Sequence, residues 1–255
     1  MGKPPTTGGV QSIERGFELL EIMASVSSPI GVSELSERAG LPVPTIHRLI
    51  RTLLNNGYVR QLPSRRYALG PRLIRLGESA TQQFGHSSRA HLAELVEAIG
   101  ETANMAVLDV NMAVYVAQVP SAHTMRMFTE VGRRVHLHCT GVGKALLMQM
   151  RDNDVRDLLT RTGMPAYTEA TFTDVDAMIA ELERSRERGY AADEAEQEIG
   201  VRCFAVPVPN APTLTAISVS GPDGRVTVDA ATEVVPILQR VARELSAEFE
   251  RDPIR

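Results

Sequence analysis

The amino-acid sequence predicts an α+β protein with two domains, and three observations favour this class. The chain has 255 residues, which is more than a single core usually holds. Its charge is divided: residues 1–85 carry ten Lys and Arg against six Asp and Glu, whereas the remainder has a net charge of −8. Apolar spacing is helical near the N-terminus and alternates between helix and strand patterns beyond residue 86.

The N-terminal part is predicted to begin with a short lead and two helices. Residues 1–9 contain neither a signal-peptide pattern nor an apolar run that could span a membrane, and we expect a disordered lead. Ser12 is expected to cap a helix with apolar residues at helical spacing, namely Ile13, Phe17, Leu20 and Ala24. A second helix covers 33–37, and Gly40 supplies the left-handed residue of a tight turn after it.

A third helix is predicted from Thr45 to about Asn55, followed by a β-hairpin over 58–69. Two short helices joined by a Gly-containing turn form a helix-turn-helix, in which the later helix enters the major groove of DNA. The hairpin has an Arg-bearing tip around 62–65 and is typical of the wing of a winged helix. The N-terminal domain is therefore predicted to be a winged helix-turn-helix.

The predicted surface of this module is positively charged over a long stretch. From Arg38 to Gly77 there are eight Arg and no Asp or Glu, whereas an ordinary solvent-exposed face mixes both signs. We therefore predict double-stranded DNA as a partner, with the wing near phosphates or the minor groove. The predicted DNA-binding residues are Thr45, His47, Arg48, Arg51, Thr52, Ser64, Arg65 and Arg66.

The motifs of this module resemble those of the IclR family of transcriptional regulators. The resemblance rests on 13–20 (IERGFELL), 41–49 (LPVPTIHRL) and 67–70 (YALG) and extends over residues 10–250. It implies a winged-helix domain at 10–70, a linker helix at 71–85 and an effector-binding domain with a GAF-like fold at 86–255. Val43 and Pro44 stand where the family commonly has Lys or Arg and then Ser, so the operator sequence cannot be inferred.

The C-terminal domain is predicted to contain a central antiparallel sheet with flanking helices. The apolar patterns predict helices at 92–99, 143–150, 155–160, 175–188 and 230–249. They predict strands at 103–109, 113–119, 125–130, 203–208 and 213–220.

The segment 136–145 (HLHCTGVGKA) is a candidate for several kinds of site. A P-loop is excluded because His138 stands where its first Gly would be and Ala145 replaces Ser or Thr. His136 and His138 are expected on one face of a strand, but without a second ligand cluster no metal site is predicted. A glycine-rich turn that opens a helix can attract an anion, and the resemblance implies that Gly141 and Val142 contact an effector.

Two further segments complete the predicted effector site. Residues 193–198 hold four acids, which by itself indicates a solvated loop, whereas the resemblance implies one wall of the effector pocket. Ser218 and Ser220 share one face of a strand, and the resemblance implies that they bind a carboxylate. The predicted effector residues are Met127, Val135, Gly141, Val142, Asp193, Cys203, Ser218 and Ser220. The segments 126–132, 162–163 and 221–222 resemble the glyoxylate- and allantoin-pathway repressors most.

These observations predict a cytoplasmic, ligand-responsive repressor with a small oxo-acid such as glyoxylate or pyruvate as effector. Two-fold symmetric proteins match two-fold symmetric DNA, so we expect a homodimer or dimer of dimers on a pseudo-palindromic operator. No catalytic residue, cofactor or membrane partner is predicted. Two alternatives stay open: an enzyme that attacks a small carbonyl acid through Cys203, and a protein-interaction adaptor whose winged helix has lost DNA binding.

Overall fold

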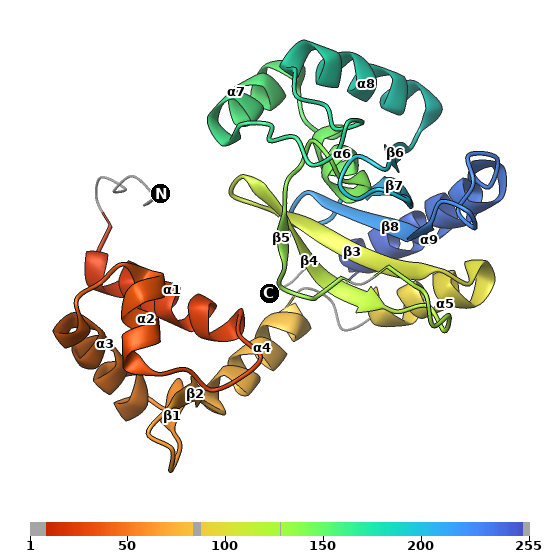
Figure 1. Ribbon diagram of the computed structural model, residues 1–255. Coiled ribbons are helices and arrows are strands. Elements are labelled where there is room, and N and C mark those ends of the chain that lie inside the picture. Colours follow the sequence, from red (N-terminus) through yellow and green to blue (C-terminus); the bar gives the residue numbers. More distant parts are fainter. Residues whose placement is uncertain (1–8, 84–87, 128, 252–255) are drawn as a thin grey trace. The chain divides into compact units, whose positions relative to one another are not determined.

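The structure is a computed structural model that describes residues 9–83, 88–127 and 129–251, and it has the predicted fold class (Figure 1). The chain divides into two compact units, Met1–Ala80 and Thr81–Arg255. The predicted lead, apart from residue 9, and positions 84–85 of the predicted linker lie outside the described residues. No helix in the described ranges is both long and apolar enough to cross a membrane.

The first unit is a helix-turn-helix with a hairpin. Its elements are α1 (Gln11–Ala24), α2 (Val32–Ala39), α3 (Val43–Asn55), β1 (Val59–Gln61) and β2 (Tyr67–Leu69), and α4 (Arg72–Gln83) follows. Gly40 ends α2 with φ +62°, which confirms the predicted left-handed turn between α2 and α3. One apolar core joins these elements, formed by Leu19, Met23, Ile30, Leu35, Ile46, Leu49, Ile50, Val59 and Tyr67.

The starts of α1 and α3 differ from the prediction. Helix α1 begins at Gln11, because the carbonyl of Val10 already accepts hydrogen bonds from the amides of Ile13 and Glu14; the prediction that Ser12 caps this helix is therefore wrong. Helix α3 begins at Val43 after Pro42. A proline in the first turn costs no helical hydrogen bond there, so Pro44 lies inside α3 rather than before it.

The hairpin is fixed to the helices by its second strand. Strands β1 and β2 pair antiparallel, and Arg65 at the tip has φ +60°. Ile30 and Tyr67 exchange two backbone hydrogen bonds of 2.8 Å each, which fasten β2 to the segment between α1 and α2. This bridge positions the wing relative to the helix-turn-helix.

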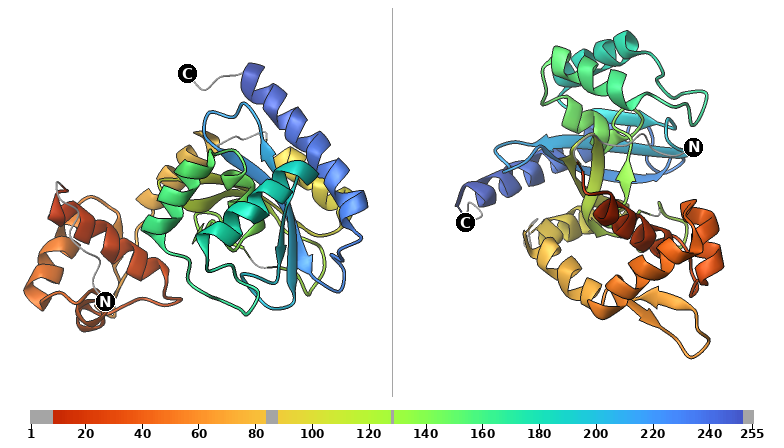
Figure 2. Two further views of the ribbon diagram at one scale, coloured as in Figure 1. Left: turned by 90° about the horizontal axis from the view of Figure 1, so that it is seen from above. Right: turned by 90° about the vertical axis from the view of Figure 1, so that its left-hand side faces the viewer.

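The second unit is a six-stranded antiparallel sheet covered by helices on both faces (Figure 2). The strand order is β5-β4-β3-β8-β7-β6. The strands are β3 (Thr102–Asp109), β4 (Met112–Val119), β5 (Arg134–Val135), β6 (Ala191–Glu194), β7 (Val201–Val208) and β8 (Thr215–Pro222). The helices are α5 (Ser88–Ile99), α6 (Gly141–Leu147), α7 (Asp152–Thr162), α8 (Val175–Arg188) and α9 (Ala231–Arg251).

The two faces of this sheet carry different side chains. Large apolar residues, including Met105, Phe204, Val206, Ile217 and Val219, form a core with α5 and α9. The opposite face, toward α6, carries small or polar side chains at the alternate positions of β3, β6, β7 and β8. We call it the small-residue face, defined by Asn104, Ala191, Asp193, Cys203, Ala205, Ala216, Ser218 and Ser220.

Several predicted elements of this unit are corrected by the structure. The described residues of 125–130 form no strand; the carbonyl groups of Met125 and Met127 bond instead to the side chains of Arg225 and Thr102. Residues 136–139 form a bend and turn, so His136 and His138 do not share a strand face. Strands β5 and β6 were not predicted.

The close packing of Gly70 gives a test of the first unit. A Cβ at this position would overlap the carbonyl oxygen of Gly57 and lie 2.8 Å from the carbonyl carbon of Tyr58, whereas one at Gly16 would meet nothing within 4 Å. We expect Gly70→Ala to lower the free energy of unfolding by about 1–3 kcal/mol, the usual cost of overpacking. Gly16→Ala, inside α1, should instead raise it by about 0.5–1 kcal/mol. Urea denaturation followed by circular dichroism checks both, and equal effects would contradict the packing argument.

Candidate DNA-binding surface and effector site

The predicted DNA-binding residues lie on α3 and on the tip of the wing. His47, Arg48, Arg51 and Thr52 are exposed on α3, opposite its buried side, and Thr45 is half-buried. Ser64, Arg65 and Arg66 are exposed at or beside the wing tip. The first unit therefore places all eight residues on its surface.

Not all of these arginines have the same freedom. Arg66 donates to the carbonyl of Pro29 over 2.6 Å and pairs with Glu34 at 3.2 Å, and Arg38 pairs with the same carboxylate. Arg48 and Arg51 form no ion pair with any described residue. Arg66 thus holds the wing against α2, whereas Arg48 and Arg51 keep their guanidinium groups available for an external anion.

The predicted effector residues are concentrated where α6 meets the small-residue face. Thr140 caps α6 by accepting a hydrogen bond from the Gly143 amide and donates to the carbonyl of His136. A Cβ on Gly141 would lie 2.6 Å from Cys203 Sγ, and one on Gly143 would lie 2.5 Å from Leu137 Cα. Gly141 therefore lets the first turn of α6 approach the sheet closely, and Gly143 lets the segment before α6 fold back against this turn.

Strand register brings the sheet residues of the site together. Asp193, Cys203 and Ser220 are direct neighbours across β6, β7 and β8, and Ser218 lies two residues before Ser220. The Ser220 hydroxyl accepts a hydrogen bond from Asn104 over 3.2 Å. The buried Ser218 hydroxyl bonds to no oxygen or nitrogen of a described residue and lies against the Cys203 thiol, a weak acceptor that a ligand can replace.

The other predicted effector residues lie differently. Val142 and Val135 are buried in the apolar cluster between α6 and the sheet. Met127 is half-buried in the segment after β4, where its carbonyl accepts a hydrogen bond from Thr102. The structure therefore brings Gly141 and the four sheet residues to one place, with Val135 and Val142 in the adjoining cluster.

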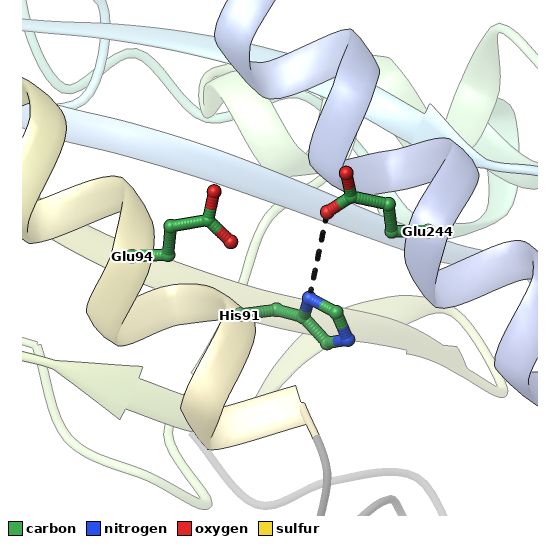
Figure 3. A group of neighbouring side chains, drawn as sticks. All are labelled: His91, Glu94 and Glu244. Atoms are coloured by element: carbon green, nitrogen blue, oxygen red, sulfur yellow. Dashed lines mark ion pairs between the residues drawn. The ribbon is translucent and has the colours of Figure 1, made fainter.

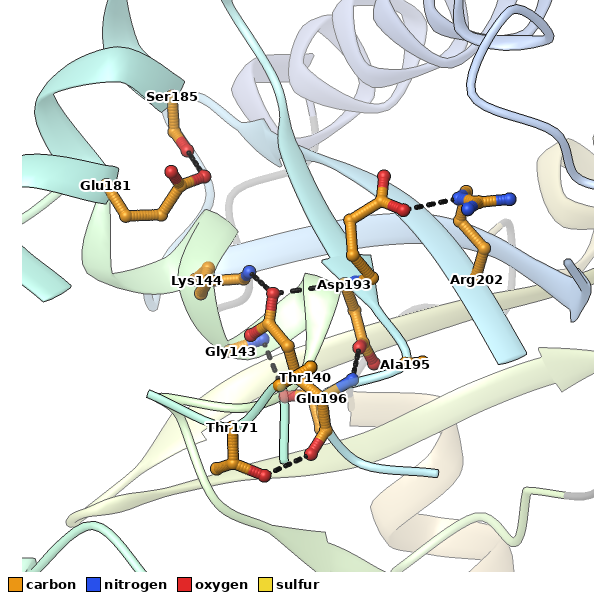
Figure 4. Close-up of polar contacts among 12 residues, drawn as sticks. Thr140, Gly143, Lys144, Thr171, Glu181, Ser185, Asp193, Ala195, Glu196 and Arg202 are labelled. Atoms are coloured by element: carbon orange, nitrogen blue, oxygen red, sulfur yellow. Dashed lines mark hydrogen bonds and ion pairs between the residues drawn. The ribbon is translucent and has the colours of Figure 1, made fainter. Parts of the chain in front are cut away.

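A buried ion pair that the sequence analysis missed holds this region together (Figure 4). Lys144 Nζ lies 2.5 Å from Glu196 Oε1, and both side chains are less than 5% exposed. Lys144 also lies over the ring of Phe172, at 5.4 Å from its centre. The Glu196 amide donates to Asp193 Oδ1 over 2.8 Å, while Glu196 Oε2 has no partner among the described residues. A lysine inside the otherwise apolar end of α6 was the available sequence signal.

The electrostatics of the site favour binding over thiol chemistry. Burial raises the pKa of Asp193 to about 7, and the neighbouring Glu196 carboxylate acts in the same direction. Burial also raises the pKa of Cys203 to about 12, as it does for Cys139. Both thiols are therefore protonated near neutral pH, and a protonated thiol is a poor nucleophile. Burial lowers the pKa of His136 and His138.

Two groups of side chains that resemble metal sites are explained by other contacts. His138 Nε2 donates to the carbonyl of Pro165 over 3.1 Å. His91, Glu94 and Glu244 lie close together between α5 and α9 (Figure 3). Arg240 pairs with Glu94 at 2.7 Å and with Glu244 at 3.0 Å, so its charge already balances these carboxylates. We assign the second group to the packing of α5 against α9.

Comparisons with known proteins give consistent results for both units. The model of the IclR helix-turn-helix domain matches residues 12–63, and that of the bacterial transcriptional regulator IclR C-terminal domain matches 80–247. Transcriptional repressor IclR of Escherichia coli K12 is 37% identical over 252 residues, which cover 96% of this chain and 92% of the relative.

Solved structures show the same fold. The crystal structure of the Thermotoga maritima IclR matches with a TM-score of 0.75 at 27% identity and covers 94% of this chain and 98% of its own. An IclR homologue from Microbacterium hydrocarbonoxydans, solved in complex with 4-hydroxybenzoate, matches with a TM-score of 0.80 at 21% identity. The match covers 94% of this chain and 99% of the homologue. The relatives are transcriptional regulators rather than enzymes, so neither the Cys203 enzyme nor the adaptor alternative is favoured.

The buried ion pair can be tested by removing one partner. Lys144→Met leaves the Glu196 carboxylate buried without its cation, and we expect it to lower the free energy of unfolding by about 3–5 kcal/mol. The double variant Lys144→Met with Glu196→Gln should be less destabilised, because it contains no uncompensated charge. Arg151→Met, which removes an exposed pair with Asp154, should cost about 1 kcal/mol or less. Urea denaturation measures all three, and a double variant no more stable than the single one would contradict the assignment.

Proposed function

The chain belongs to the IclR family of DNA-binding transcriptional regulators and is a repressor, and we propose that a small carboxylate controls its affinity for DNA. The observation that carries the proposal is the small-residue face beneath α6, where the buried Ser218 hydroxyl bonds to no oxygen or nitrogen of a described residue. A ligand that binds two arrangements of the protein unequally shifts their populations, and DNA affinity changes with them. The DNA target implies that the protein acts in the cytoplasm.

The proposed DNA contacts come from α3 and the wing. Arg48 and Arg51 on α3 would contact base edges or phosphates in the major groove, together with Thr45, His47 and Thr52. Ser64, Arg65 and Arg66 would contact phosphates or the minor groove. The absence of acids between Arg38 and Gly77 supports this assignment, because no carboxylate there repels the DNA.

The proposed effector is a small oxo-acid such as glyoxylate or pyruvate. A carboxylate needs hydrogen-bond donors, and the Ser218 and Ser220 hydroxyls and the start of α6 at Gly141 lie beside Cys203. Val135, Val142 and Met127 would supply the apolar boundary. The 4-hydroxybenzoate bound by a homologue is also a carboxylate, which supports the ligand class but not the particular acid.

We further propose that the protein acts as a homodimer or dimer of dimers on a pseudo-palindromic operator. Large apolar side chains are exposed on α1 and α4, where Phe17 is 64% and Ile74 is 65% exposed. Ile13, four residues before Phe17, extends the exposed apolar side of α1, and Leu76 is exposed at a second position on α4. Exposed apolar side chains that gather on helices are typical of interaction surfaces.

The DNA contacts predict a loss of binding for Arg48→Ala. We expect its affinity for the DNA upstream of its own gene to fall about 5- to 150-fold, the usual effect of losing a base or phosphate contact. Arg151→Ala, which removes an exposed arginine of the second unit, should have no effect. Fluorescence anisotropy measures both.

A salt series in the same assay gives a second criterion. Wild-type affinity should fall by about tenfold or more between about 50 and about 200 mM salt, because counterions are released from phosphates. No binding, or a flat salt response, would contradict the proposed interface.

The exposed apolar residues predict an effect on self-association. Phe17→Ser combined with Ile74→Ser should raise the dissociation constant of the wild-type dimer at least about tenfold, since each change removes up to about 1.5–3 kcal/mol of apolar burial. Val110→Ser, at an exposed turn of the second unit, is the matched control. Sedimentation equilibrium measures the three constants, and a monomeric wild type would contradict the proposed assembly.

A further inference from the structure

The carboxylate site proposed above contains Asp193, a buried acid that is among the predicted effector residues but has been given no chemical role so far. We propose that Asp193 determines the charge of the bound species: the site takes up a carboxylate together with one proton, and Asp193 carries that proton. This inference rests on the proposed effector class and adds a specificity-determining residue to it.

Asp193 lies inside the site rather than at its rim. It is 4% exposed, at the centre of β6, and its strand neighbour across β7 is Cys203, whose sulfur limits the approach of Gly141. One carboxylate oxygen accepts the Glu196 amide over 2.8 Å. A ligand that reaches Cys203 and Ser220 therefore meets the Asp193 carboxyl group away from water.

The buried charges around Asp193 leave it without a cation of its own. Lys144 on α6 is paired with Glu196 on the segment after β6, at 2.5 Å. The Glu196 carboxylate thus already neutralises the single positive charge of Lys144, and no positive charge remains for Asp193. With an ionised Asp193, the net charge of Lys144, Glu196 and Asp193 together would be −1. A bound carboxylate would make the net charge −2.

The other titratable groups that face this region do not change the balance. Glu181 on α8 is held by Arg184 and Arg188, each at 2.8 Å. Glu194 on β6 pairs with Arg202 on β7 at 2.7 Å. Arg133, which lies near Tyr115, is exposed, so solvent screens its charge.

The remaining titratable groups of this region are neutral near pH 7. They are Tyr115 on β4, Tyr167 on the segment before α8, Cys203 on β7, and His136, His138 and Cys139 on the segment before α6.

Protonation of Asp193 is the change that removes the repulsion most easily. Burial and the nearby Glu196 carboxylate already raise the pKa of Asp193 to about 7, and a bound anion raises it further. A protonated carboxyl group is also a hydrogen-bond donor, which a second carboxylate oxygen or an oxo group can accept. The same residue therefore removes a negative charge and supplies a donor.

The linkage has a definite sign. Below about pH 7 Asp193 is already protonated in the free protein, so affinity for the anion is independent of pH. Above about pH 7 each bound anion must take a proton from solvent, and affinity falls about tenfold per pH unit.

Isothermal titration calorimetry with the full chain tests this directly. The probes are glyoxylate, pyruvate and 4-hydroxybenzoate, titrated in buffers of different ionisation enthalpy at about pH 6 and about pH 8. We expect uptake of about one proton per bound acid at the higher pH and almost none at the lower.

Three variants locate the proton. Asp193→Asn keeps the size of the side chain and the acceptor for the Glu196 amide, and it should bind the acid without proton uptake and independently of pH. Glu194→Gln, which changes the adjacent exposed acid, should behave as the wild type. Glu196→Gln should lower the uptake, because Lys144 is then left to neutralise an ionised Asp193.

The outcomes separate this inference from the proposed function. Binding without proton uptake at about pH 8, or uptake that persists in Asp193→Asn, overturns the role of Asp193 and leaves the effector class standing. Failure of all three acids to bind the wild type at either pH overturns the effector class and this inference together. If Asp193→Asn does not fold, the proton count of the wild type decides the matter alone.

Discussion

The buried ion pair between Lys144 and Glu196 is the interaction on which the second unit depends most. It joins α6 to the segment between β6 and β7, and neither partner has access to water that could replace the other. The Glu196 carbonyl also accepts a hydrogen bond from Thr171 over 2.6 Å, and Thr168 donates to the carbonyl of Ala195. Three segments far apart in the chain are thus fixed at one point. Burying this pair without such contacts would be costly, because each charge loses its hydration.

This constraint explains how a sheet face that carries small side chains can serve as the proposed binding site. Large side chains on the α5 and α9 face supply the apolar core, so the face beneath α6 can carry serine, cysteine and aspartate. Gly141 lets the start of α6 lie close to those side chains, and the ion pair keeps α6 in place. The basic surface of the first unit is built separately, from the exposed side of α3 and from a hairpin bridged to the helices through Ile30 and Tyr67.

The sequence was sufficient to predict those features that depend on local pattern. Periodicity located most helices, Gly40 located the turn before α3, and the acid-free run located the basic surface. Features that depend on distant partners were missed. Residues 125–130 have a strand-like pattern, but their backbone bonds to the side chains of Thr102 and Arg225. The acids of 193–198 suggest a solvated loop, yet Asp193 and Glu196 are buried. Glu196 can be buried because its partner Lys144 lies 52 positions away in sequence and 2.5 Å away in space.

The central claim is that a carboxylate on the small-residue face controls DNA binding, and Gly141→Ala tests it most directly. The added Cβ would lie 2.6 Å from Cys203 Sγ and fill the space between α6 and the sheet.

Fluorescence anisotropy with the DNA upstream of the gene, with and without glyoxylate, pyruvate or 4-hydroxybenzoate, gives the required comparison. The account predicts that at least one acid changes the affinity of the wild type about tenfold, the size of a typical coupling between sites. It predicts that Gly141→Ala, folded as judged by circular dichroism, binds the DNA equally well without responding to that acid. A variant that responds as strongly as the wild type would contradict the account.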